Sequence, residues 1–140
     1  MIIGKRENDM EKQSLIERAK QAANNAHAPY SGFQVGAALL TKDGKIFTGC
    51  NIENGSFGAT CCAERTAFFK AVSEGARQFE AIAVVGGKNG DFSKPCLPCG
   101  ICRQVMAEFC GSDFEILLQG EDGTSKIYKL SDLLPHTFSL

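Results

Sequence analysis

The sequence lacks the features that would place a protein in a membrane or on a nucleic acid. Its 140 residues contain no apolar run of membrane-spanning length, and the first residues contain no hydrophobic stretch long enough for a secretory signal. The formal net charge is only −1, which provides no bulk attraction for polyanions. We therefore expect a cytoplasmic protein with neither a membrane nor a nucleic acid as its partner.

Internal repeats, low-complexity tracts and linkers are also missing, so the sequence offers no domain boundary. A chain of this length can bury a single core of ordinary size. Its 44% of hydrophobic and 22% of charged residues are normal for a soluble globular protein. We expect residues 1–140 to form one domain.

Hydrophobic periodicity and turn residues predict the element order α-β-β-α-β-α-β-β-α. The predicted helices cover residues 10–27, 62–75 and 100–110, with a last turn after residue 131, and the predicted strands cover residues 33–41, 45–51, 81–86, 114–119 and 125–130. Pro29 is expected to end the first helix. A strand–helix–strand order predicts a parallel pair, and the short last turn predicts an antiparallel hairpin. The expected fold is an α/β three-layer sandwich with a mixed five-stranded sheet.

Cysteine is abundant, with seven in this short chain. They are Cys50, Cys61, Cys62, Cys96, Cys99, Cys102 and Cys110. An odd number without an export signal argues against a disulfide framework. In a reducing compartment, clustered cysteines bind metal, act in catalysis or fill the core. We expect Cys50 and Cys110 to be buried apolar fillers.

Three cysteines and a glutamate have the spacing of a catalytic zinc site. Cys99 and Cys102 form a C-x-x-C pair that shares one face of a helix, and Cys62 begins another predicted helix. Three thiolates leave the fourth tetrahedral position open, as catalytic zinc requires. Glu64 is placed to take a proton from water at that position, and Arg65 would offset the negative charge of the thiolates.

A second C-x-x-C register is present, because Cys96 also precedes Cys99 by three residues. We favour Cys99 with Cys102, since Pro98 can precede a helix but interrupts the earlier pair. At the other motif, Cys62 rather than Cys61 has the spacing to the glutamate.

Two other uses of a C-x-x-C pair are open from spacing alone. A redox dithiol would not need the Cys62–Glu64 motif. A zinc ribbon requires a second, separate C-x-x-C, which the sequence lacks outside residues 96–102.

These motifs and their surroundings resemble the small homotetrameric cytidine deaminases of the cytidine and deoxycytidylate deaminase superfamily. The resemblance rests on residues 30–38 (YSGFQVGAA), 49–54 (GCNIEN), 62–67 (CAERTA), 98–104 (PCGICRQ) and 133–135 (LLP). It extends from about residue 14 to the C-terminus. It implies the cytidine deaminase-like fold and one Zn²⁺ per subunit, held by Cys62, Cys99 and Cys102.

The resemblance also implies an activity. This is the hydrolytic deamination of cytidine and 2′-deoxycytidine to uridine and 2′-deoxyuridine, with release of ammonia, in pyrimidine salvage. Glu64 would move the protons, and Arg65 would hydrogen-bond to the zinc thiolates. Because related enzymes are tetramers, we expect a homotetramer with active sites completed by neighbouring subunits.

Five positions match substrate contacts of that family. Asn51 and Glu53 match the segment that binds the ribose hydroxyls, Phe33 matches a pocket wall, and the backbone of Ala63 matches a contact to the pyrimidine O2 region. Phe138 matches an aromatic residue that reaches a neighbouring subunit. By pattern alone, an ordinary polar strand end is the favoured interpretation of Asn51 and Glu53, and a core residue that of Phe33.

Other members of the superfamily and one unrelated class are alternatives. Blasticidin-type deaminases share the metal site, but the Asn51–Glu53 pair favours a ribose. Polynucleotide and tRNA deaminases usually have a crossover helix between the last two strands, for which residues 120–124 are too few. Glu64 argues against a non-catalytic zinc-binding module. Phe57 departs from the family pattern, since many relatives have tyrosine there.

Overall fold

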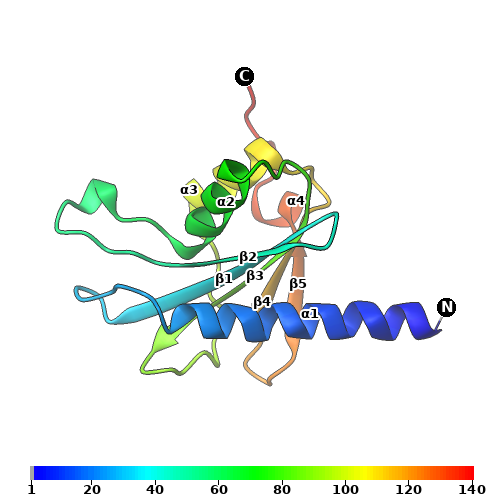
Figure 1. Cartoon of the computed structure of the whole chain (residues 1–140), viewed down its shortest axis with the longest axis horizontal. Coiled ribbons are helices and arrows are strands. Elements are labelled where there is room, and N and C mark those ends of the chain that lie inside the picture. Colours follow the sequence, from blue (N-terminus) through cyan, green and yellow to red (C-terminus); the bar gives the residue numbers. More distant parts are fainter. Residues whose placement is uncertain (1) are drawn as a thin grey trace.

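The computed structural model describes the backbone of residues 2–140 and the side chains of residues 11–140. Its elements are α1 (Ile2–Ala23), β1 (Phe33–Thr41), β2 (Ile46–Cys50), η1 (Phe57–Ala59), α2 (Ala63–Ser73), β3 (Phe79–Lys88), α3 (Gly100–Phe109), β4 (Glu115–Gln119), β5 (Ser125–Lys129) and α4 (Leu130–Leu133). Figure 1 shows α1 on one side of the sheet and the three other α-helices on the opposite side. Among the described residues, no helix has both the length and the apolarity needed to cross a membrane.

The sheet has five strands in the order β2-β1-β3-β4-β5. Strand β1 pairs antiparallel with both β2 and β3, while β3 and β4 are parallel and are connected through α3. Strands β4 and β5 form the antiparallel hairpin that the short turn between them predicts. The predicted fold class, a mixed five-stranded sheet between helical layers, is confirmed.

Each face of the sheet carries its own hydrophobic core, because side chains alternate along a strand. Ala38 and Leu40 of β1 belong to the core beneath α1. Ala37 and Leu39 belong to the opposite core, which contains residues of α2, α3 and α4. Cys62 and Cys99, two of the predicted zinc ligands, lie at the starts of α2 and α3, so the second face is the one that positions the candidate site.

The first helix ends earlier than the sequence indicates. It stops at Ala23, and turn hydrogen bonds follow at Asn24, Asn25 and Ala26, so Pro29 does not terminate it. The reason is long-range: the chain after the helix is held by the segment that follows β2. His27 N donates to Asn51 O at 3.0 Å, and Glu53 N donates to His27 O at 2.7 Å. This pairing brings residues 27–33 beside the end of β2.

Candidate active site

Three cysteine thiols, those of Cys62, Cys99 and Cys102, meet where α2 and α3 begin. Their Sγ atoms all lie within 4.8 Å of one another. The distance is 3.8 Å between Cys62 and Cys99 and 3.7 Å between Cys99 and Cys102. Tetrahedral zinc with Zn–S bonds of about 2.3 Å places its sulfur ligands about 3.8 Å apart. The spacing of these thiols therefore fits one zinc ion.

Both helices that carry the cluster present their N-termini to it. Cys62 is the N-cap of α2 and Cys99 is the N-cap of α3, each with an extended backbone, while Cys102 lies in the first turn of α3. Free N–H groups and the positive end of the helix dipole stabilise thiolates at this position. The predicted helix starts at both motifs are confirmed.

Charge is shared unevenly among the three thiols. Hydrogen bonds from Cys102 and from Arg65, whose Nη2 lies 3.3 Å from Cys62 Sγ, lower the pKa of Cys62 to about 5. The contact with the Cys62 sulfur, together with burial, raises the pKa of Cys102 far above its usual range. Full ionisation of the cluster therefore requires a cation, since neighbouring negative charges disfavour one another. Soft thiolate donors at tetrahedral spacing select Zn²⁺ rather than a hard cation such as Mg²⁺.

Glu64 is the buried acid of the site. It is the second residue of α2, and only 4% of its surface is exposed. Burial raises the pKa of this carboxyl to about 7, and the neighbouring Cys62 thiolate acts in the same direction. A carboxyl with this proton affinity can both accept and return a proton near neutral pH.

A cavity of about 350 Å³ opens over this cluster. Cys62, Glu64 and Cys99 line it, and so do four residues that the sequence assigns to the substrate: Phe33, Asn51, Glu53 and Ala63. The fifth, Phe138, lies elsewhere. The structure thus brings two of the predicted metal ligands, the acid and most of the predicted substrate contacts to one pocket, while the third predicted ligand, Cys102, is buried beside Cys99.

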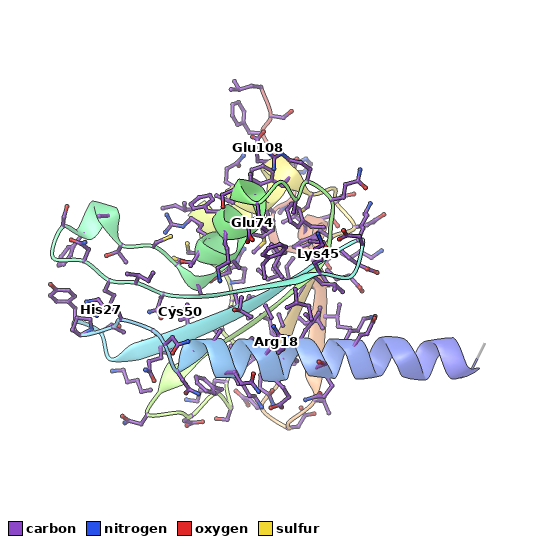
Figure 2. The ribbon with its side chains drawn as sticks, viewed as in Figure 1. Arg18, His27, Lys45, Cys50, Glu74 and Glu108 are labelled. Carbon is purple, nitrogen blue, oxygen red and sulfur yellow. The ribbon has the colours of Figure 1, made fainter. Side chains whose placement is uncertain are left out.

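A larger hollow of about 440 Å³ lies at a different place, between the β1–β2 turn and the end of α2. Lys45 and Glu74 line it. Figure 2 shows these two residues well separated from His27 and Cys50, which lie next to the pocket segments. Of these two cavities, the smaller one is lined by clustered thiols and a buried acid. Its lining residues, rather than its size, therefore identify it as the candidate site.

The side chains of Asn51 and Glu53 already have partners within the chain. Asn51 Oδ1 accepts from Val35 N, and its Nδ2 donates to Phe33 O, both at 2.8 Å. Glu53 accepts from the backbone N–H groups of Tyr30 and Ser31 at 2.9 and 3.1 Å, and from Ser31 Oγ at 2.5 Å. The Ser31 hydroxyl lowers the pKa of Glu53, which keeps the group a carboxylate. These contacts fix both side chains at the pocket rim.

Ser31 is a pocket residue that motif reasoning did not single out. It lies 22 positions from Glu53, so no local spacing connects the two residues. The only available signal is that Ser31 falls within the stretch 30–38, which carries part of the family resemblance.

Phe138 lies outside this pocket. Its side chain is 66% exposed, and the C-terminal segment projects beyond α3 and α4 (Figure 1). The segment is held to α3 by Gln104 Nε2, which donates to Phe138 O at 3.4 Å. Arg103 Nη1 donates to Leu133 O at 2.7 Å and so holds α4 to α3.

The remaining cysteines are not part of the thiol cluster. Cys96 lies in the loop before α3 and lines the pocket, while Cys61 accepts a hydrogen bond from Thr66 Oγ1. Cys50 and Cys110 are half-buried, rather than fully buried as their predicted role as core fillers implies. Burial raises the pKa of Cys110 to about 12, so its thiol stays neutral.

The helix that carries Cys62 and Glu64 rests directly on a glycine. Gly49 of β2 lies beneath the first turns of α2, and a Cβ there would lie 2.5 Å from Ala63 O and 2.6 Å from Ala67 N. Both contacts are with backbone atoms of the helix, which cannot rotate out of the way as a side chain can. The absence of a side chain at Gly49 therefore allows α2 to pack this close to the sheet.

Gly49→Ala is expected to displace the start of α2. Overpacking should lower the free energy of unfolding by about 1–3 kcal/mol. Because the displaced turn carries Cys62 and Glu64, retained zinc should fall as well. Thermal unfolding and metal analysis test this, with Gly111→Ala as the control, since a Cβ at Gly111 meets open space. Equal stability and equal zinc in both variants would contradict the prediction.

The fold and the site together define a metal-dependent hydrolytic class: an α/β sandwich whose paired helix starts hold a thiolate cluster beside a buried acid. Residues 9–117 match the family model for the cytidine and deoxycytidylate deaminase zinc-binding region. The chain belongs to the cytidine and deoxycytidylate deaminase family.

Individual relatives cover nearly the whole chain. The cytidine deaminase of Halalkalibacterium halodurans is 53% identical over 130 residues, which are 93% of this chain and 96% of the relative. That of Sporosarcina psychrophila is 50% identical over 93% of both chains. The crystal structure of cytidine deaminase from Burkholderia pseudomallei superposes with a TM-score of 0.82 at 50% identity, covering 90% of this chain and 98% of that one.

Proposed function

We propose that this protein deaminates cytidine and 2′-deoxycytidine to uridine and 2′-deoxyuridine, with release of ammonia, in pyrimidine salvage. One observation carries the proposal: a single pocket is lined by Cys62 and Cys99 of the metal-spaced thiol cluster, by the buried Glu64, and by the Asn51–Glu53 pair. Relatives that are half identical over almost the full chain have the name cytidine deaminase.

In this proposal, Cys62, Cys99 and Cys102 hold one Zn²⁺ per subunit. When bound, zinc with three protein ligands acts as a Lewis acid that lowers the pKa of water toward neutrality. Glu64 accepts the proton of the attacking water and delivers it to N3 of the cytosine ring, which makes C4 electrophilic. The hydroxide that remains bonds to C4. Glu64 then moves the proton of this new hydroxyl to the amine at C4, so that the C4–N bond breaks, ammonia leaves and the C4 carbonyl of the product forms. Arg65 stabilises the thiolate charge through its hydrogen bond to Cys62.

The substrate contacts support a nucleoside rather than a free base. Glu53 is a carboxylate at the pocket rim, and carboxylates accept hydrogen bonds from hydroxyl groups such as those of a ribose. Asn51 lies beside it, Phe33 forms an apolar wall, and the backbone of Ala63 lies next to the metal ligands. We assign the pyrimidine O2 region to Ala63 and the sugar to Asn51 and Glu53.

A direct assay tests the proposed function. The zinc-loaded protein is incubated with cytidine, 2′-deoxycytidine and blasticidin S, and turnover is followed as loss of ultraviolet absorbance and release of ammonia. Turnover of both nucleosides is expected. Binding of zinc and cytidine without turnover would favour a non-catalytic binding module, and turnover of blasticidin S alone would favour the other deaminase.

We further propose a homotetramer in which Phe138 of one subunit enters the pocket of a neighbour. An exposed phenylalanine on a projecting segment, held to α3 by Gln104, supports this role. A solution mass of four chains is expected.

Phe138→Ala is expected to lower kcat/KM for cytidine by about tenfold, since truncating one apolar contact in a binding pocket costs about 1–3 kcal/mol. Steady-state kinetics measure this change, with Ser139→Ala as the control. If Phe138→Ala keeps full activity and an unchanged solution mass, the cross-subunit role is wrong. If the wild-type protein has the solution mass of a monomer, the proposed tetramer is wrong.

A further inference from the structure

A glycine near the end of β3 lies directly beneath the wall of the pocket. Gly86 pairs with Val35 of β1, and residues opposite each other in an antiparallel pair share one face of the sheet. Val35 lines the pocket and packs against the core beneath α2 and α3. Any side chain at position 86 would therefore point toward the pocket face.

Two side chains from separate parts of the chain occupy the space that a residue at position 86 would need. A Cβ on Gly86 would lie 2.6 Å from Cys96 Sγ and 2.8 Å from Phe33 Cε1. Both neighbours line the same cavity as Glu64. The thiol of Cys96 comes from the loop before α3, and the ring of Phe33 comes from the start of β1.

The contacts of Gly86 differ in kind from those of the next residue. A Cβ on Gly87 would lie 1.7 Å from the backbone oxygen of Asp91, so that glycine is required by the chain turn itself. At Gly86 the two nearest atoms are the ends of side chains, which can rotate away. A methyl group there would push Cys96 and Phe33 off the strand and into the pocket, whereas the strand itself could stay in place.

We propose that Gly86 is a positioning residue that sets the width of the nucleoside pocket by letting Cys96 and Phe33 pack across β3. This inference rests on the proposed function, because it assigns the space above that wall to the nucleoside. It also gives Cys96 a role: the thiol fills the gap above the glycine rather than binding the metal. Burial raises the pKa of Cys96 to about 12, which agrees with a neutral, space-filling group.

The decisive variant is Gly86→Ala. One added methyl group in an apolar pocket changes kcat/KM by about tenfold or more. We expect this change as a higher KM for cytidine, with kcat altered by less than about twofold, because a loss of that kind reflects substrate binding rather than the reaction step. Zinc content should equal that of the wild-type protein. Gly111→Ala, which adds the same methyl group in open space, should leave KM unchanged.

The double variant Gly86→Ala/Cys96→Ala tests the mechanism. Removing the Cys96 sulfur relieves the shortest contact but leaves that with Phe33, so KM should fall part of the way back toward that of the Cys96→Ala single variant, a coupling typical of residues in contact. Should Gly86→Ala fail to fold, Cys96→Leu probes the same contact from the other side. Its larger side chain above Gly86 should likewise raise KM.

The outcomes separate this inference from the proposed function. If zinc-loaded wild-type protein does not turn over cytidine, the proposed function is wrong and the inference fails with it. If the wild-type protein is active but KM is unchanged in Gly86→Ala, or in Cys96→Leu where that variant is used, only the inference is overturned. A raised KM that Cys96→Ala does not relieve would overturn the role given to Cys96.

Discussion

Glu64→Gln is expected to lower kcat for cytidine by about 10⁴-fold, the upper range for loss of a general acid–base group. Glutamine has nearly the same volume, so the buried position at the start of α2 remains filled. It cannot accept a proton from water or return one to the leaving amine. Steady-state kinetics measure the loss, and metal analysis should show one zinc per subunit, since the three thiol ligands are unchanged.

Glu74→Gln is the matched control for this experiment. Glu74 lies just past the end of the same helix and is exposed, so the identical chemical change occurs away from the thiol cluster. Its activity should equal that of the wild-type protein. Near-normal activity of Glu64→Gln with zinc bound would show that another group moves the protons.

The second large effect is expected for Cys102→Ala. Cys102 is almost fully buried, with 1% of its surface exposed, and its sulfur lies 3.7 Å from that of Cys99. Loss of a direct ligand should lower zinc affinity by more than about 10²-fold, because even outer-shell partners contribute about 10–100-fold. Activity should be lost with the metal, and the thermal unfolding temperature should fall.

Cys110→Ala provides the control, because it removes a thiol just past the other end of α3. The neutral, half-buried Cys110 should tolerate the change with zinc and activity retained. Stoichiometric zinc in Cys102→Ala would mean that another donor completes the site. Cys96, the alternative in the sequence, would then be tested in the same way.

The candidate metal ligands could be chosen from the sequence because the rules that select them are local. Pro98 precedes a helix, Cys99 caps it, and Cys102 follows on the same face, so one register of the two was physically favoured. The order of strands and helices along the chain, with parallel pairing in the middle of the sheet, also follows from short-range patterns. The structure has the predicted sheet and brings together the three predicted thiols.

What the sequence did not predict depends on contacts between distant segments. The end of α1 at Ala23 follows from pairing with residues 51–53, not from Pro29. The hydrogen bonds from Ser31 to Glu53 join positions 22 residues apart. The position of Cys96 above Gly86 results from a loop folding back onto the sheet, and no periodicity in the chain encodes it.

The placement of Cys62 and Cys99 also has a consequence for chain topology. The two residues are 37 positions apart, and the segment between them contains β3, the middle strand of the sheet. An ion bound to both closes that segment into a loop, much as a disulfide would. A covalent link across a loop of this length restricts the unfolded chain by roughly 4 kcal/mol. Removing the zinc with a chelator should therefore increase amide hydrogen exchange along β3 itself, well beyond the residues that contact the metal.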